Sequence, residues 1–307
     1  MTSMASPKPS DRPRIASVRR WRSWATRVGF LSPFYIPFAL FFLLPIGYAV
    51  VQSTLGIHRS GGVFGTTSTY FEGFGQYLQV FADPDFQSGI LRVVLFAVFQ
   101  VPVMIVASVA IALLLDATAP RVAALFRSLY FLPYAVPGVI AALMWGALYV
   151  PDTSPLWAAG IHIDLVNSQL VLPAMANIGL WAYGGYNVIL FVTALTAVPT
   201  ELYEAAKIDG ASAWRIALSV KLPLIRPTIV MAVLFNSIGT LQVFTEPEVF
   251  RTISRVVSSG YTPNMLAFNA AVGNGYNYAA AVSVTLAVVT FIISFGFLRL
   301  VQGRGRA

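Results

Sequence analysis

Six long stretches of uncharged, apolar residues constrain the fold of this chain more than any other feature of its sequence. Each is long enough to cross the roughly 30 Å hydrocarbon core of a bilayer as an α-helix. Backbone polar groups in lipid must be satisfied by helices or closed barrels, and these runs lack the alternation of barrel strands. The sequence therefore predicts an all-α polytopic membrane protein with six transmembrane helices. The stretches are 31–54, 93–115, 128–150, 170–198, 227–245 and 279–298.

The composition agrees with a membrane protein and argues against several other classes. Of the 307 residues, 57% are hydrophobic and 10% are charged, whereas roughly a quarter are charged in soluble domains. Cysteine is absent and only His58 and His162 carry imidazole, so no metal or redox site is expected. In a soluble protein the net charge of +8 would suggest nucleic acid as a partner. In a membrane protein the same basic residues report topology instead, and no nucleic acid is expected.

The Lys and Arg residues are divided unevenly between the loops. If the N-terminus is cytoplasmic, sixteen of the 20 fall on the cytoplasmic side, as the positive-inside rule requires. Both termini are therefore expected inside the cell. We expect residues 1–30 to form a basic, disordered cytoplasmic tail before an uncleaved first span. Residues 31–300 would form the six-helix transmembrane domain and residues 301–307 a second cytoplasmic tail.

Two loops assigned to the outside are long and rich in Gly and aromatic residues, 55–92 and 246–278. Such loops suit a gate or a docking surface for a partner, although they also suit ordinary extracellular connections. Proline lies within several spans, and a proline inside a helix removes a hydrogen bond and kinks the helix. Kinks are therefore predicted at Pro37, Pro45, Pro102, Pro133 and Pro137.

The central parts of the spans contain no Asp, Glu, Lys or Arg. Ion-coupled carriers usually hold ionisable groups at membrane depth, and membrane enzymes need titratable groups, so neither class is favoured. A channel or uniporter remains open. Neutral polar groups beside aromatic rings suit a hydroxyl-rich solute, although they equally serve to join helices. The candidate pathway residues are Trp181, Tyr183, Asn187, Asn236 and Gln242.

The segment between the fourth and fifth predicted spans reads VPTELYEAAKIDGASAWRIALSVKLPLIRP. Gly210 is expected to divide it into two short helices, and Pro223 and Pro227 mark the return to the membrane. An amphipathic helix could lie in the headgroups. Its charges are of both signs, which favours docking into a protein groove. Apolar residues at helical spacings would supply the contacts: Tyr203, Ile208, Trp214 and Ile216.

Within this segment, EAAKIDG (204–210) and VKLP (220–223) resemble the EAA signature of binding-protein-dependent ABC importers, in which EAAxxxG is followed by I-x-LP. Val220 stands where Ile is usual. The longer sequence EAAKIDGASAW, together with KLPLIRP, is similar to the first permease of the carbohydrate-uptake family, as in maltose and glycerol-phosphate transporters. Residues 126–149 and 31–53 are similar to that family's third and first spans. SSGYTPNML (258–266) departs from its GGP-type loop.

The resemblance implies a type I ABC importer permease fold, with coupling helices at 201–218 seated in a cleft of a nucleotide-binding subunit. The coupling residues it implies are Glu204, Ala205, Ala206, Ile208, Gly210, Trp214, Val220, Leu222 and Pro223. Because the chain lacks a GxxxxGK[ST] phosphate loop, it is expected to be no enzyme and to hold no cofactor, with ATP and Mg bound by partner ATPase subunits.

The implied partners are an ABC ATPase dimer, a second homologous permease, an extracytoplasmic solute-binding protein and the lipid bilayer. The implied location is a bacterial or archaeal cytoplasmic membrane. A sugar or oligosaccharide is the expected solute, carried by alternating access. Glycerol phosphate or another small polar solute is the alternative, and a channel or uniporter is the rival from another class.

Overall fold

The computed structural model describes residues 28–60, 66–167 and 169–303, which fall into two compact units divided after Gln52. The described part of the first unit is a single apolar helix, Val28–Gln52. A π-helical turn, η1 (Ala39–Leu43), precedes α2 (Leu44–Gln52) and lies between Pro37 and Pro45. This helix matches the predicted first span. Most of the predicted basic tail, residues 1–27, lies outside the described residues.

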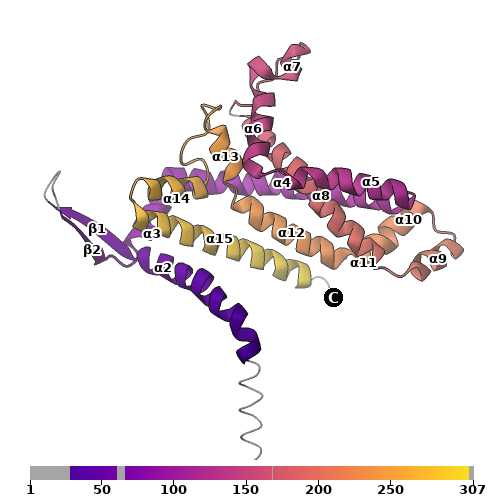
Figure 1. Ribbon diagram of the computed structural model, residues 1–307, viewed down its shortest axis with the longest axis horizontal. Coiled ribbons are helices and arrows are strands. Elements are labelled where there is room, and N and C mark those ends of the chain that lie inside the picture. The colour runs from indigo at the N-terminus through magenta and orange to yellow at the C-terminus, as the bar shows by residue number, and fades with distance from the viewer. Residues whose placement is uncertain (1–27, 61–65, 168, 304–307) are drawn as a thin grey trace, which may run out of the picture. The chain divides into compact units, whose positions relative to one another are not determined.

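The second unit contains helices and one antiparallel hairpin (Figure 1). Helices α4, α8, α12 and α15 are its long elements, and α4 packs along α8 and α12. At one end lie α9 to α11, and at the other lie α3, α14 and the hairpin (Figure 1). The elements are β1 (Leu55–Ser60), β2 (Thr66–Phe71), α3 (Gly75–Ala82), α4 (Pro84–Asp116), α5 (Pro120–Phe131), η3 (Leu132–Ala135), α6 (Gly138–Tyr149), η4 (Pro151–Thr153), α7 (Pro155–Ala158), α8 (Val171–Thr196), α9 (Thr200–Ile208), α10 (Ala213–Ile216), η5 (Ala217–Lys221), α11 (Leu222–Leu224), α12 (Arg226–Leu241), α13 (Thr245–Phe250), α14 (Pro263–Val272) and α15 (Tyr276–Gly303).

Five helical segments of the described residues are long and apolar enough to cross a bilayer, and a bent pair of helices brings the number to six. The α4 helix begins well before the predicted start at residue 93. Its first turn is capped by Asp83, whose side chain accepts from the Asp85 amide, and Pro84 suits the first helical position. The α15 helix extends to Gly303, within the segment 301–307 that was expected to form a tail.

The third predicted stretch, 128–150, is not one straight helix. The chain turns by 94° between the segment that ends at Ala135 and α6, which starts at Gly138. A residue that precedes proline is pushed out of the helical region, and Val136, which precedes Pro137, is extended with ψ of 125°. The prediction of a kink at Pro133 and Pro137 is confirmed. The prediction that residues 128–150 form a single continuous helix is corrected.

Both long loops contain regular structure. In the first, β1 pairs with β2 so that Leu55 lies opposite Phe71, and α3 follows. The hairpin is an addition to the predicted all-helical fold, and it lies outside the spans. The second loop contains α13 and α14. Near its end Asn274 adopts a left-handed conformation with φ of 62°, which asparagine tolerates better than most residues.

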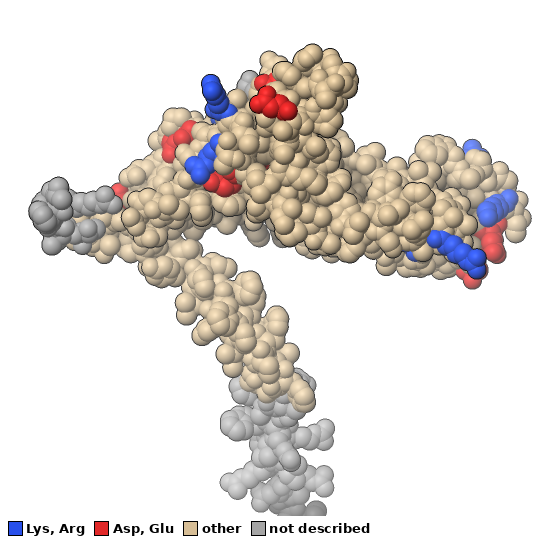
Figure 2. Space-filling view, turned by 45° about the horizontal axis from the view of Figure 1, so that its top comes forward, with Lys and Arg blue, Asp and Glu red and all other residues tan. Residues whose placement is uncertain are grey.

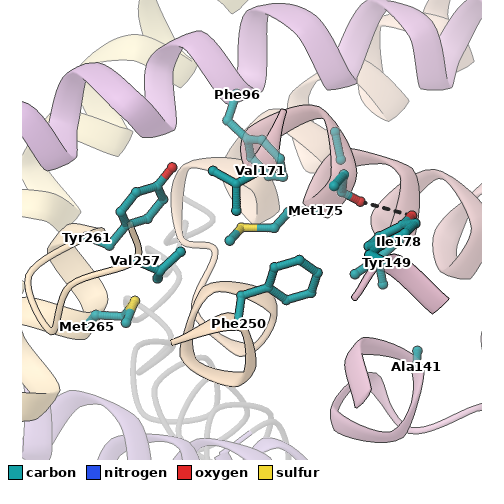
Figure 3. Packing of buried hydrophobic residues seen from close by; sticks show 12 residues of the cluster. Phe96, Ala141, Tyr149, Val171, Met175, Ile178, Phe250, Val257, Tyr261 and Met265 are labelled. Atoms are coloured by element: carbon teal, nitrogen blue, oxygen red, sulfur yellow. Dashed lines mark hydrogen bonds between the residues drawn. The ribbon is translucent and has the colours of Figure 1, made fainter. Parts of the chain in front are cut away.

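The long helices bury one side and leave many large apolar side chains exposed on the other, as expected of helices that face lipid or a partner. One core cluster lies where α6, α8 and the 243–265 region meet, and it includes Met175, Phe250 and Met265 (Figure 3). A second cluster joins α4, α8 and α12. On the face shown in Figure 2, Lys, Arg, Asp and Glu gather in two places, at the right-hand end of the second unit and over its upper part left of the middle, and the surface between these places is almost free of them.

Candidate functional site

Residues 198–227, which contain the EAA signature and are called the EAA segment below, begin with two short helices joined by a turn. Residue Gly210 follows α9 with φ of +78°. The Ala211 amide donates to the Ala206 carbonyl, and the Gly210 amide donates to Lys207, each at 3.0 Å. This pair of bonds is the Schellman motif, in which glycine supplies the left-handed residue. The predicted division of the segment at Gly210 is therefore confirmed.

The α10 helix begins immediately after this turn. Ser212 caps it by accepting from the Arg215 amide at 3.3 Å. The chain then continues through η5 and α11 without a turn, so that Val220, Leu222 and Pro223 form the connection to α12.

The apolar residues of the segment divide between its surface and its interior. Ile208 is 86% exposed and Trp214 is 71% exposed, and Glu204 and Ala205 are also exposed beside them. Ile216, predicted to belong to the same surface, is buried instead. Two large apolar side chains in water are unfavourable, so this surface suits a protein partner.

A charged cluster ties the segment to the end of α4. Lys221 forms an ion pair with Asp116, the last residue of α4, and both side chains are mostly buried. The Lys221 ammonium also lies 4.8 Å from the ring centre of Tyr203 on α9. Burial raises the pKa of Tyr203, and Asp116 raises it further. The protonated hydroxyl donates to the Leu195 carbonyl at 3.4 Å.

A cavity of about 540 Å³ lies between α4, α8, α12 and the two chain breaks near residues 132–137 and 242–244. Four of the five predicted pathway residues line it: Tyr183, Asn187, Asn236 and Gln242. The fifth, Trp181, does not. Its ring packs against Trp145 at 5.9 Å, beside the core cluster of Figure 3.

Aromatic rings form one wall of this cavity. Tyr134, on η3, stacks on Tyr186 with ring centres 5.4 Å apart, and it meets Tyr183 edge to face at 6.2 Å. Rings of this kind can cover the C–H faces of a sugar, and their hydroxyls can bond its hydroxyl groups.

The asparagines of the cavity hold two helices together. The Asn236 amide donates to Asn187 Oδ1 at 2.8 Å, and Asn187 donates back at 3.4 Å. Each amide also donates to a carbonyl of its own helix, at Tyr183 and Ala232. All the amide hydrogens are therefore used within the protein, so this pair shapes the wall and leaves only acceptor positions free.

The second break, between α12 and α13, is supported by two side chains at the start of α14, one from its N-cap residue Thr262 and one from Asn264 in its first turn. Asn264 donates to the Gln242 carbonyl at 2.6 Å, and Thr262 donates to the Val243 carbonyl at 3.3 Å. Irregular backbone at membrane depth is tolerated where it is satisfied by protein or lines a cavity. Both residues belong to SSGYTPNML, the segment that departs from the family pattern.

The lining also includes residues outside the five candidates, among them Gln100, Tyr134 and Glu246. Gln100 lies at the midpoint of α4, and its polarity within an apolar run was a usable signal. Glu246 had been taken as loop because it follows the predicted end of a span at residue 245. It is 8% exposed and lies near the end of the apolar helical segment Arg226–Phe250, outside the central parts of the spans that were expected to be free of charge.

Comparison with known proteins identifies relatives across most of the chain. Residues 85–306 match the family described as "Binding-protein-dependent transport system inner membrane component". The diacetylchitobiose uptake system permease protein NgcF of Streptomyces coelicolor is 29% identical, over 94% of this chain and 87% of its own length. The lactose transport system permease protein LacF of Rhizobium radiobacter is 28% identical, over 95% and 97%.

The fold is also found in a solved structure. One chain of a bacterial alginate ABC transporter, crystallised in complex with an alginate pentasaccharide-bound periplasmic protein, superposes with a TM-score of 0.75 at 19% sequence identity. The superposition covers 93% of this chain and 96% of that one. At this identity the match establishes the fold alone.

Proposed function

Because the chain belongs to the family of binding-protein-dependent transport system inner membrane components, we propose that it carries a sugar or oligosaccharide across the cytoplasmic membrane by alternating access. It is a permease subunit, and ATP hydrolysis belongs to a separate polypeptide. Diacetylchitobiose and lactose appear in the names of its relatives. The tyrosine-lined cavity supports the same class of solute.

The observation that carries the proposal is the exposed EAA surface. Ile208 and Trp214 are exposed on either side of the Gly210 turn, and Glu204 is exposed as well. Such a surface fits a cleft in a nucleotide-binding subunit, where Glu204 would pair with a basic residue. Closure of the ATPase dimer on ATP would then move α9 and α10, and with them α4 and α12 through the Asp116–Lys221 ion pair.

The remaining partners follow from this mechanism. A second permease would complete the pathway, and an extracytoplasmic solute-binding protein would deliver the sugar. ATP and Mg would bind only to the ATPase subunits. The N-terminus and the EAA segment would lie in the cytoplasm, in agreement with the distribution of Lys and Arg.

The test is sugar uptake by the complete complex reconstituted in proteoliposomes with its binding protein. Glu204→Lys should abolish uptake and solute-stimulated ATP hydrolysis while the chain still inserts. The matched control is Glu201→Lys, which changes the same charge in the same helix outside the motif and should leave most activity.

Substitutions at Gly210 provide a second test of the coupling role. Gly210→Pro removes the amide that donates to Lys207 and forces φ to about −65°, so it should also abolish coupling. Gly210→Asn should retain it, because asparagine tolerates the left-handed region. Normal uptake in both Glu204→Lys and Gly210→Pro would refute the coupling role.

A further inference from the structure

We infer that Glu246 determines the charge class of the solute: the cavity accepts neutral or amine-bearing sugars and excludes those that carry a carboxylate or phosphate. This inference rests on the proposed function and makes its substrate class more specific. It starts from the one carboxyl group among the described residues that line the cavity.

The position of Glu246 is defined by its helix. It lies in the first turn of α13, directly after the break at 242–244, and only 8% of it is exposed. Glu246 takes part in neither of the two ion pairs found among the described residues, which are Lys221–Asp116 and Arg251–Glu248. None of the described lining residues is Lys, Arg or His.

The other polar groups of the cavity add acceptors. Gln100 is 6% exposed, and its Oε1 atom has no hydrogen-bond partner among the described residues. The amide nitrogen of Gln100 occupies the space where Gly179 has no side chain. The Asn187–Asn236 pair has used all its amide hydrogens. An unpaired amide oxygen and a carboxylate both require donors from the solute.

A sugar hydroxyl or ammonium group supplies those donors, whereas a carboxylate or phosphate supplies none and brings a like charge towards Glu246. Like charges repel, and the repulsion is stronger where burial lowers the effective dielectric constant, as it does around Glu246, which is 8% exposed. The surrounding fold is shared with a transporter described as importing the acidic polysaccharide alginate, so any exclusion of acidic sugars must come from side chains such as Glu246 and not from the fold.

The first step of the test uses the wild-type complex in proteoliposomes with its binding protein. Uptake of diacetylchitobiose, lactose and trehalose identifies the neutral sugar carried fastest, and failure of all three would count against the proposed function. That sugar is then compared with two analogues, one with a primary alcohol oxidised to a carboxylate and one with it replaced by an amine. Binding of each probe to the isolated binding protein is measured in parallel, so that uptake is compared at equal occupancy.

We expect the carboxylated analogue to enter about tenfold or more slowly than the neutral sugar, and the amine to enter at least as fast, since about 1.4 kcal/mol of repulsion corresponds to tenfold. Equal uptake of the carboxylated and neutral sugars by the wild-type complex would overturn the inference, and this arm needs no variant.

Glu246→Gln keeps the shape of the side chain and removes its charge. It should therefore reduce the gap, meaning the ratio of the uptake rates of the neutral and the carboxylated sugar, to about threefold or less. Glu248→Gln, two residues along the same helix and outside the cavity lining, should leave the gap unchanged. A purely structural role of Glu246 would slow both sugars alike, and an unchanged ratio in Glu246→Gln would therefore refute the assignment.

Discussion

At the scale of single residues, glycines position much of the candidate machinery, and they do so for different reasons. Gly210 is needed for its backbone angle, because nothing lies within 4 Å of the place a Cβ would occupy. Gly179 is needed for space, which the Gln100 amide fills. Gly185 is also needed for space, since it packs directly on the backbone of Tyr130 and Phe131. The sequence predicted the backbone role of Gly210, whereas it does not show what Gly179 and Gly185 pack against, because both lie within one apolar stretch.

Gly185→Ala tests the close approach of α8 to the segment that carries Tyr134. The new Cβ would collide with the Tyr130 carbonyl, which is backbone and cannot turn aside. Overpacking of this kind costs about 1–3 kcal/mol. Thermal unfolding in detergent should show a clear loss of stability. Gly184→Ala is the matched control, since its Cβ would meet only Met104 Sδ at an ordinary 3.9 Å. Equal stability of the two variants would show that α8 does not make this contact.

At the scale of elements, hydropathy was sufficient to predict the helices but not their interruptions. The apolar stretches form helices because lipid leaves the backbone no other local partner. The bend at Val136 was readable, since Pro133 and Pro137 are local signals. The break at 242–244 was not, because its carbonyls are satisfied by Thr262 and Asn264, about twenty residues away. For the same reason Glu246 could not be assigned to the cavity from sequence.

The link between α4 and the EAA segment is the element contact that most needs testing. Asp116→Asn removes the charged acceptor of Lys221, and a hydrogen bond to a charged group contributes about 1.5–3 kcal/mol. We expect lower sugar-stimulated ATP hydrolysis in Asp116→Asn and in Lys221→Met. Tyr203→Phe keeps the ring beside Lys221 and loses only the bond to Leu195, so its effect should be smaller.

A double-mutant cycle separates this ion pair from general destabilisation. If Asp116 and Lys221 act through each other, the double variant should be no worse than the more severe single variant, and the coupling energy should lie in the range of about 0.5–3 kcal/mol. Effects that simply add would mean that the two side chains act independently, and the proposed mechanical link would fail.

At the scale of the whole molecule, two long helices, α4 and α12, run between the cavity and the EAA segment. Through α4, the cavity residue Gln100 is connected to Asp116, the partner of Lys221. Through α12, Asn236 and Gln242 are connected to the Arg226 end, next to α11. Rigid helices that join a cavity to a docking surface are what alternating access requires. A channel with the same cavity would need no such connection.

This difference can be measured with single cysteines, because the chain has none of its own. Gly239 lines the cavity and has open space where a side chain would lie, so Gly239→Cys should be tolerated. In the reconstituted complex, a membrane-impermeant thiol reagent should label it from the cytoplasmic side without nucleotide and from the outer side when ATP is trapped on the ATPase. Two exposed positions serve as controls, Ser219 in the EAA segment and Ser258 in the 246–278 loop. In every state, Ser219→Cys should be labelled only from the cytoplasmic side and Ser258→Cys only from the outer side. Labelling of Gly239→Cys from both sides in every state would indicate an open channel, and labelling of Ser219→Cys from outside would reverse the proposed orientation.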